Sequence, residues 1–202
     1  NAAYSDDATP FNHCFIGDGK SFLAVKPGDA ASLLAEAKKV EGWGRGRTWY
    51  LPNQVKLFTD GAIYSQLMQM KGGYTDGHHG AWITDPPDFD FMFQTYWDAG
   101  YQIHIHINGD AGLEMVLASF EKAMARQPRT GHRTVLVHFG FSQPEQVAKW
   151  IQLGGLVSSN PYYVTALAGR YAKLGIGPER SANIVAHGDV LKGNGSLSFH
   201  SD

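Results

Sequence analysis

The second half of the chain alternates between helix-like and strand-like segments, and this alternation most limits the folds that the chain can adopt. The strand-like segments run through Tyr101 to Ile107, Thr134 to His138, Leu156 to Ser159 and Ser196 to Ser201. Alternating strands and helices form right-handed crossovers and assemble a parallel sheet covered by helices. We therefore expect an α/β fold, namely a partial or complete TIM (β/α)8 barrel, with a doubly wound sheet as the alternative.

Helix start signals separate these strands. The predicted helices are Ala30 to Lys39 behind Asp29, Asp88 to Ala99, a helix with Asp110 as its N-cap, and a helix opened by the capping box Ser142 to Glu145. An earlier strand is expected at Val55 to Phe58, closed by a turn at Asp60-Gly61. The segment from about Gly72 to Pro87 is expected to be a loop.

The length of the chain limits how much of a barrel it can form. With 202 residues, it is shorter than the roughly 250 residues of a typical complete barrel. It does not begin with methionine, and it ends at Asp202 directly after a strand-like segment. No linker, repeat or charge block divides it. We expect one catalytic barrel domain over residues 1–202, truncated at both ends.

Composition excludes several classes of partner. The chain has 17 Lys and Arg against 19 Asp and Glu, a net charge of -2, and no basic cluster that would follow a nucleic-acid backbone. No apolar run approaches the roughly 20 residues that span a bilayer. The single cysteine, Cys14, cannot form an internal disulfide. We expect a cytoplasmic protein that binds a small molecule, not nucleic acid or membrane, and that can form a homo-oligomer.

Residues with ligand capacity lie on four different predicted strands. Lys56 is on the first, His106 is near the end of the second, and His138 ends the third. Asp202 follows the last strand. In a parallel barrel, the C-terminal ends of the strands meet at one mouth, so these side chains should converge. Imidazoles and a carboxylate in one place are typical of a hydrolytic metal centre.

Four motifs then carry a resemblance to a known family: Val55 to Ala62, His106 to Asp110, Val137-His138 and Phe199 to Asp202. Together they resemble the amidohydrolase superfamily, and within it the branch called amidohydrolase family 3, which includes N-substituted formamide deformylases. The similarity runs in order from Val55 to the last residue, about three quarters of the chain. The fold that it implies is the TIM barrel of metal-dependent hydrolases.

The resemblance also implies a site and a reaction. Lys56, His106, His138 and Asp202 would be the metal ligands, with Lys56 carboxylated, and the cofactor would be a divalent metal, zinc first, as one or two ions. Such an ion activates a water molecule and polarises the substrate carbonyl. Asp202 would act as general base and then as general acid. The substrate would be an amide or N-formyl compound, cleaved at its C-N bond.

The sequence departs from the family in one respect. The family has a His-x-His pair on its first barrel strand, and no such pair precedes Lys56. His104 and His106 have this spacing, but they follow the lysine strand, so we interpret His104 as a packed or supporting residue beneath His106. The missing pair agrees with a truncated chain, and it leaves open whether these 202 residues are active alone.

Other polar and aromatic residues in the predicted loops could contact a substrate. Each also has a structural explanation: a turn, a solvated loop, local packing or a surface charge. The candidate substrate-binding residues are Asp60, His78, His79, Tyr162, Tyr163, Arg180 and His200.

Two other functions remain open at this point. The chain could be a catalytically incompetent barrel fragment or a non-catalytic binding module, for which the missing histidine pair is the main argument. A barrel enzyme that handles phosphorylated sugars ranks third, because no glycine-rich anion loop follows the late strands.

Overall fold

The computed structural model describes residues 4, 6–24 and 27–202. Their strands form a six-stranded sheet in the order β1-β2-β3-β4-β5-β6, and every neighbouring pair is parallel. The strands are β1 (His13–Asp18), β2 (Thr48–Phe58), β3 (Gln102–Ile107), β4 (Val135–His138), β5 (Leu156–Ser159) and β6 (Ser196–Phe199). A doubly wound sheet reverses its strand order at a switch point. This strict sequential order is that of a partial TIM barrel, and the fold prediction is confirmed.

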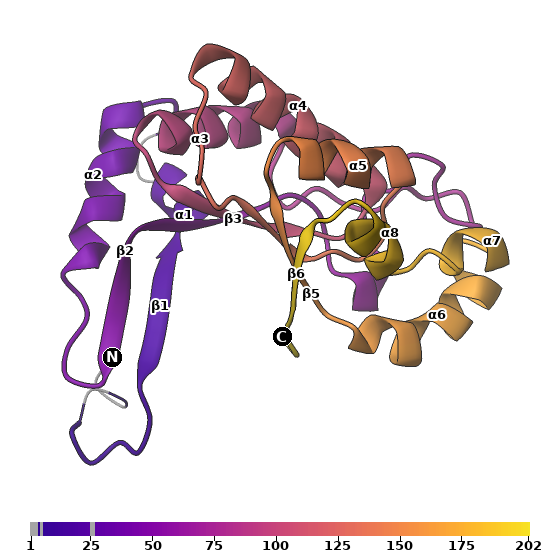
Figure 1. The fold of residues 1–202 in the computed structure, drawn as a ribbon, viewed down its shortest axis with the longest axis horizontal. Helices are drawn as coiled ribbons and strands as arrows, with labels where there is room; N and C mark the ends of the chain where they lie inside the picture. Colours follow the sequence, from indigo (N-terminus) through magenta and orange to yellow (C-terminus); the bar gives the residue numbers. More distant parts are fainter. Residues whose placement is uncertain (1–3, 5, 25–26) are drawn as a thin grey trace.

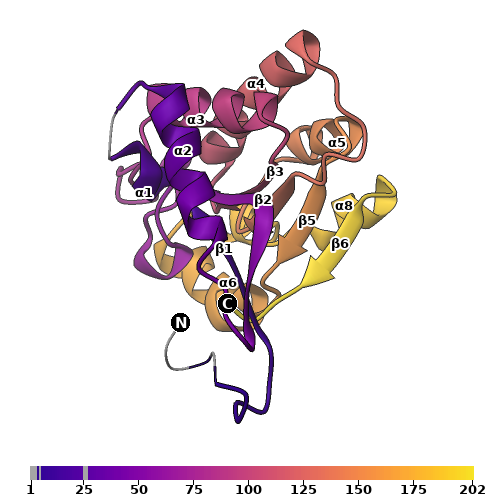
Figure 2. The same cartoon turned by 90° about the vertical axis from the view of Figure 1, so that its left-hand side faces the viewer.

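Helices connect the strands and cover one side of the sheet. They are α1 (Gly19–Leu23), α2 (Ala30–Glu41), η1 (Ile63–Ser65), α3 (Pro86–Asp98), α4 (Asp110–Arg126), α5 (Pro144–Gln152), α6 (Tyr162–Leu174), α7 (Pro178–Ser181) and α8 (His187–Lys192). Figure 1 shows α3, α4 and α5 along one side of the sheet, with β1 and β2 at one end and β6 and α6 to α8 at the other. The perpendicular view shows α2 to α5 on the outside of the strands (Figure 2).

The other side of the sheet is hollow. A cavity of about 420 Å³ is lined by residues from all six strands, including Ile16 of β1, Lys56 of β2, His104 of β3 and Ser198 of β6. A single hollow can reach both edge strands only if the sheet curves around it. The helix-free face is therefore the inside of the partial barrel.

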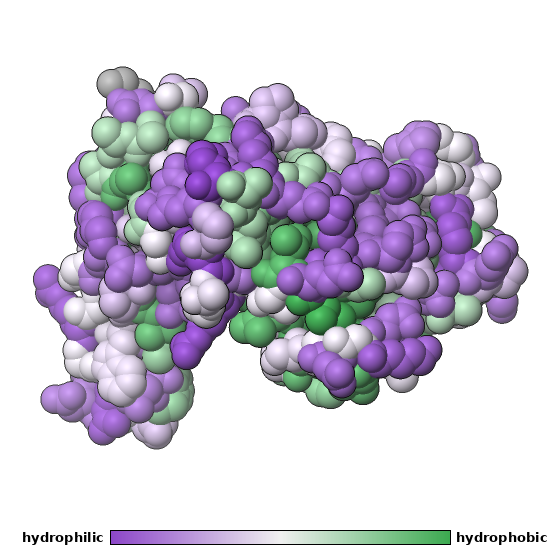
Figure 3. Space-filling view, turned by 45° about the horizontal axis from the view of Figure 1, so that its top comes forward, coloured by the Kyte–Doolittle hydropathy of each residue, from purple (hydrophilic) through white to green (hydrophobic). Residues whose placement is uncertain are grey.

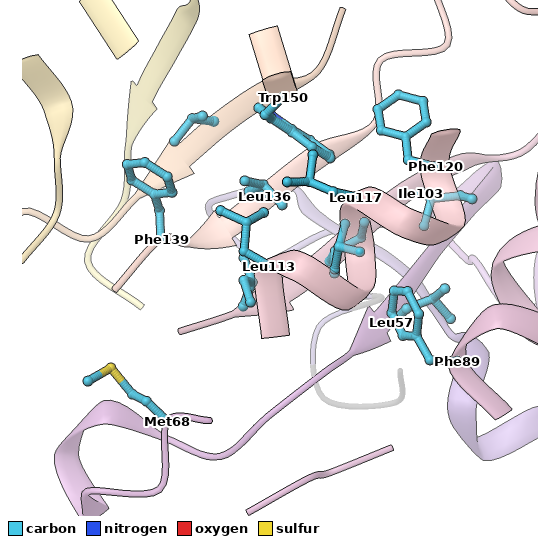
Figure 4. Close-up of a cluster of buried hydrophobic side chains, with 14 of the residues drawn as sticks. Leu57, Met68, Phe89, Ile103, Leu113, Leu117, Phe120, Leu136, Phe139 and Trp150 are labelled. Carbon is cyan, nitrogen blue, oxygen red and sulfur yellow. The ribbon is translucent and has the colours of Figure 1, made fainter. Parts of the chain in front are cut away.

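The main hydrophobic core lies between the strands and α3, α4 and α5. Leu113, Leu117 and Phe120 of α4 pack over strand residues such as Ile103 and Leu136, with Trp150 of α5 beside them (Figure 4). On β3 the isoleucines are buried in this layer while the residues between them are half-buried on the opposite face. This alternation with a period of two assigns His104 and His106 to the inside of the barrel.

The strands predicted from the sequence are confirmed in position and order, but the first half of the fold was only partly predicted. The strand β1 was not predicted, and β2 begins at Thr48 and not at Val55. A helix begins at Tyr162, where a loop was expected. The helix after Asp29 is confirmed, since the Asp29 carboxylate accepts hydrogen bonds from the N–H groups of Ala31 and Ser32.

Two predicted helix caps were wrong by one residue. Gly109 and not Asp110 is the N-cap of α4, because Asp110 already has its place in the first turn. The capping box of α5 joins Gln143 and Gln146, so Ser142 lies just outside it.

The surface carries both polar and apolar side chains, as expected for a folded domain. Figure 3 shows apolar side chains gathered near the middle of one face with polar side chains around them. Among the described residues, no helix is both long enough and apolar enough to cross a membrane.

Candidate metal centre

The register of the parallel strands aligns the candidate ligands at one end of the barrel interior. Lys56 pairs with His104 and Phe58 with His106 across β2 and β3. Ile107 then pairs with His138 across β3 and β4. The residues that continue β6, His200 and Asp202, extend from the same end of the sheet, where the backbone N–H of His200 donates to Ser159 O at 3.0 Å.

His138 reaches this interior through an unusual backbone conformation. Val137 pairs with the inward-facing His106, so simple alternation would turn the next side chain, that of His138, outward. Its φ is instead +78°, followed by +56° at Phe139. Left-handed conformations are costly for residues with a Cβ and are concentrated at functional sites. Here they bring the His138 imidazole into contact with the other candidate ligands.

The side chains form one cluster. The ring centroids of His106 and His138 are 4.6 Å apart, and those of His138 and His200 are 5.3 Å apart. His138 Nδ1 lies 3.6 Å from Asp202 Oδ2. The ligand atoms of His138, His200 and Asp202 all lie within 4.8 Å of one another. The structure thus groups His138, Asp202 and His200, while His106 packs edge-on against His138 and is not part of this group of ligand atoms. The metal-ligand roles of these residues stay predictions.

Lys56 lies beside this cluster. Its Nζ is 5.8 Å from the centroid of the Phe58 ring. Burial lowers the pKa of Lys56 to about 8, although the nearby Asp202 carboxylate acts in the opposite direction. A substantial fraction of this amine is therefore neutral in weakly alkaline solution.

The histidines are held in their neutral form. Burial and the positive charge of Lys56 lower the pKa of His106 to about 4. Burial, together with His106, Lys56 and His200, lowers the pKa of His138 to about 3. A neutral imidazole has a free lone pair, which is the form that binds a metal ion.

These residues fit a divalent metal. His138 Nδ1 and His200 Nε2 are both buried and have no hydrogen-bond partner. Buried polar atoms without a partner are costly, and a bound cation would satisfy both. Two imidazole nitrogens and a carboxylate oxygen are the donor set that zinc prefers.

Asp60 is placed away from this opening. It is fully buried, and its carboxylate accepts hydrogen bonds from four groups: Thr59 Oγ1, Asn108 N, Gln69 N and Gly109 N. Burial raises its pKa to about 6, against the lowering effect of these bonds. In this structure Asp60 accepts from three backbone N–H groups and one hydroxyl, and its substrate-binding role stays a prediction.

The loop histidines and Arg180 also make internal contacts. His78 stacks on Tyr74 with ring centroids 4.1 Å apart, and its Nδ1 lies 2.6 Å from Asp76 Oδ1. His79 Nδ1 lies 3.2 Å from Met70 O. Arg180 donates from Nη1 to Gly73 O at 2.7 Å and so ties α7 to this loop. All three residues brace the loop that follows β2.

The two tyrosines after β5 have different environments. Tyr162 is 61% exposed, whereas Tyr163 is buried and packs edge-on against Tyr64, with centroids 5.5 Å apart. Burial raises the pKa of Tyr163, and the negative charge of Asp202 raises it further. This interaction with Asp202 shows that the Tyr163 ring lies near the cluster. Tyr163 is therefore better placed than Tyr162 to border the site.

Sequence reasoning missed Asn108. It is buried, and its Nδ2 lies 3.1 Å from His106 Nε2 and 3.3 Å from Gly61 O. The available signal was its spacing, because a residue two positions after His106 faces the same side of an extended chain. His104, interpreted as a supporting residue, contacts Gln54 Oε1 through Nε2 at 3.0 Å, one layer below the cluster.

A partial parallel barrel with a cluster of histidines and an aspartate at its strand ends has the layout of barrel enzymes, whose active sites lie at this end of the sheet. Comparison with known families then gives a direct result. The model of the Amidohydrolase family matches residues 7–202, so the chain belongs to that family. The superfamily expected from the four motifs is confirmed, while the formamide deformylase branch and the truncation stay predictions.

Individual relatives are more distant. Over 157 residues the chain is 26% identical to Protein LONG AFTER FAR-RED 3 of Arabidopsis thaliana, covering 76% of this chain and 27% of that protein. An uncharacterized metal-dependent hydrolase from Pyrococcus horikoshii OT3 has a similar fold, with a TM-score of 0.64 and 22% identity over 82% of this chain and 33% of that one. Its counterpart from Pyrococcus furiosus has a TM-score of 0.64 and 18% identity, covering 85% of this chain and 40% of that one. The chain thus spans well under half the length of these relatives.

Proposed function

We propose that this chain carries the metal-binding part of a hydrolase that cleaves a C-N bond in an amide or N-formyl compound. The observation that carries the proposal is the convergence of His106, His138, His200 and Asp202, with unpartnered buried nitrogens on His138 and His200. Family membership supports the reaction class. The two Pyrococcus structures are similar to this chain in fold.

His106, His138 and Asp202 would hold the ion, with zinc as the first choice and one or two ions bound. His200 was expected to contact substrate, but its position beside His138 suits either role. A bound divalent ion supplies a Lewis acid that polarises the substrate carbonyl and lowers the pKa of a water molecule. The rest of the chemistry falls to the side chains of the chain.

Lys56 would join as a carboxylated ligand. An ammonium has no lone pair and cannot bind a cation. The lowered pKa of Lys56 favours the neutral amine, which can add carbon dioxide by forming an N–C bond and releasing a proton. The carbamate produced is an anion with two oxygens, which suits a bridge between two ions.

Asp202 would move the proton. Its side chain is 53% exposed and lies 3.6 Å from His138 Nδ1. A carboxylate in this position can reach both a water molecule and a bound substrate. It would accept the proton of the attacking water and return it to the leaving nitrogen, so that one group acts first as base and then as acid.

The substrate is proposed to carry a bulky apolar or aromatic amine. Tyr163 and the exposed Tyr162 follow β5, where barrel enzymes place substrate-binding loops. Asp60, His78, His79 and Arg180 would act indirectly, by shaping the loops around the opening. A cytoplasmic location and a homo-oligomeric state belong to the same proposal.

Metal binding is the first test. Zn²⁺ or Co²⁺ binding to the chain is measured by chelator competition in wild type, His138→Asn and Asp202→Asn. His132→Asn is the matched control, since His132 is a buried histidine outside the cluster that contacts Thr134. We expect one or two tightly bound ions, lost in the first two variants and kept in the control. Equal binding by all four proteins would refute the proposed site.

Activity is the second test. Two proteins are assayed: the metal-loaded chain, and a longer chain that contains the same site and adds a His-x-His pair. The substrates are N-formyl amines, aryl amides and matched esters. Release of amine from the amide or N-formyl substrates, abolished in Asp202→Asn, is the expected result. Hydrolysis of esters alone would contradict the C-N bond assignment.

The second candidate function is that of a metal-binding or other binding module without catalysis. The 202 residues themselves supply no His-x-His pair before Lys56, where His13 is the only histidine. Binding of metal without turnover in either form of the protein would support it.

A further inference from the structure

A fully buried carboxylate with four hydrogen-bond donors, that of Asp60, lies next to the candidate metal centre. Asp60 Oδ1 accepts from Thr59 Oγ1 at 2.6 Å and from Asn108 N at 3.0 Å. Its Oδ2 accepts from Gly109 N at 2.7 Å and from Gln69 N at 2.8 Å. One carboxylate therefore joins the end of β2, the loop after it and the turn between β3 and α4.

Two connections lead from Asp60 to His106. The Asn108 N–H is bonded to Asp60, and the Asn108 side chain places its Nδ2 3.1 Å from His106 Nε2. On the other side, the Thr59 N–H donates to the backbone oxygen of His106 at 3.1 Å, and the Thr59 hydroxyl that bonds to Asp60 lies 2.8 Å from the same oxygen. Asp60 is thus hydrogen-bonded to Asn108, which contacts the ring of His106, and to Thr59, which contacts its backbone oxygen.

The Asn108 contact assigns roles to the two nitrogens of His106. Because Nδ2 is a donor, the metal-free ring accepts at Nε2 and carries its proton on Nδ1. Histidines that bind a metal through one nitrogen usually donate from the other to a fixed acceptor. Asn108 Oδ1 is buried without a hydrogen-bond partner. A half-turn of the Asn108 amide would exchange Nδ2 for Oδ1 and so supply the acceptor that an Nε2–H needs once Nδ1 binds an ion.

The packing leaves little freedom in this arrangement. A Cβ added at Gly109 would lie 2.1 Å from Gln69 O, and one added at Gly112 would lie 3.1 Å from Asp60 Cγ. The loop, the turn and the carboxylate are therefore in close contact. An asparagine at position 60 would have one acceptor oxygen, and its NH2 group would face backbone N–H donors, so only the carboxylate satisfies all four partners.

We propose that Asp60 is a positioning residue that sets the orientation and tautomer of His106 through Asn108, and so tunes metal binding without touching the ion. This inference rests on the proposed function, in which His106 is a ligand. It differs from the substrate-binding role expected for Asp60 from the sequence, since the side chain is fully buried.

The test compares Asp60→Asn and Asn108→Ala with Asp110→Asn as the matched control. Asp110 is also buried and also accepts a backbone N–H, from Lys71 at 2.9 Å, but it has no link to His106. Folding is checked by circular dichroism and urea unfolding. Co²⁺ affinity is measured by chelator competition, and the His106 tautomer is read from the ring 15N shifts of the metal-free protein.

We expect the wild-type His106 ring to carry its proton on Nδ1. Asn108→Ala, and Asp60→Asn where folded, should mix the two tautomers in the metal-free protein. Both variants also remove or displace the Asn108 oxygen that would accept from Nε2–H when Nδ1 binds the ion, so they should weaken Co²⁺ binding by about tenfold or more. Asp110→Asn should change stability alone. If Asp60→Asn does not fold, Asn108→Ala still tests the proposal. It removes the side-chain contact with the His106 ring and keeps the hydrogen bond from the backbone N–H of residue 108 to Asp60.

Two results would overturn the proposal: an unchanged His106 tautomer in Asn108→Ala, or an equal loss of Co²⁺ affinity in Asp110→Asn. Failure of the proposed function gives a different result. A wild-type chain that binds no Co²⁺ would refute the metal site, while the 15N shifts would still show whether Asp60 and Asn108 set the ring.

Discussion

Lowering the pH should destabilise the metal-free protein, because the folded state resists protonation of the histidines inside the barrel. Burial lowers the pKa of His104 and His106 to about 4 and that of His138 to about 3. In the unfolded chain, a histidine has a pKa of about 6.5. Between these values the unfolded state binds more protons, so stability is present above about pH 6.5 and is lost as the pH falls toward 4.

The size of this effect follows from the same values. Between pH 7 and pH 5 each of the three histidines should lose about 2 kcal/mol, or about 6 kcal/mol together. Asp60 opposes them, because its pKa of about 6 lets the folded state take up a proton in this range, which returns about 1.4 kcal/mol. A net loss of roughly 4.6 kcal/mol is a large part of the 5–15 kcal/mol that stabilises a typical domain.

Urea unfolding in the presence of a chelator at pH 7, 6 and 5 measures this loss. His104→Gln isolates one of the three groups, and its loss between pH 7 and pH 5 should be smaller by about 2 kcal/mol. His13→Gln, at an exposed position of β1, is the control and should follow the wild type. A stability that is constant from pH 7 to 5, or a His104→Gln curve parallel to the wild type, would refute the reasoning.

Three further results are expected. Gly109→Ala should lose about 2 kcal/mol or more in urea unfolding because its Cβ would lie 2.1 Å from Gln69 O, whereas Gly188→Ala, with no atom within 4 Å, should change little. Asp29→Ala should cost about 1 kcal/mol by removing the N-cap of α2, and should leave Co²⁺ affinity unchanged in chelator competition. Zn²⁺ at 100 times its Kd should stabilise the wild type by about 2.7 kcal/mol in thermal unfolding and should not stabilise His138→Asn. Equal stabilisation of both proteins would mean that the ion binds elsewhere.

The sequence was informative where structure is local. The strands β3 to β6 could be predicted from short apolar or alternating runs: β3 and β6 alternate, whereas β4 and β5 begin with consecutive apolar residues. By contrast, β1 has a mixed run from His13 to Asp18 without such alternation. The early part of β2 contains Pro52 and Asn53, the latter with a φ of +54°, and both residues argue against a strand. Pairing with neighbouring strands overrides these local preferences.

The sequence predicted which residues belong to the candidate site better than it predicted where their side chains lie. Motif order pointed to His106, His138 and Asp202, but alternation alone would turn His138 away from them. The role of Asp60 depends on a hydrogen bond to Asn108, 48 positions later in the chain. Contacts of this kind follow from the completed fold, so a turn at Asp60-Gly61 was all that local reasoning could predict.

The left-handed backbone at His138 and Phe139 has a consequence for the stability of the fold. Glycine adopts such φ values without the roughly 1–2 kcal/mol that other residues lose there. Replacing His138 by glycine would therefore relieve backbone strain that alanine would keep. The turn after β4 therefore carries a cost in backbone strain at the same residue that places an imidazole in the cluster.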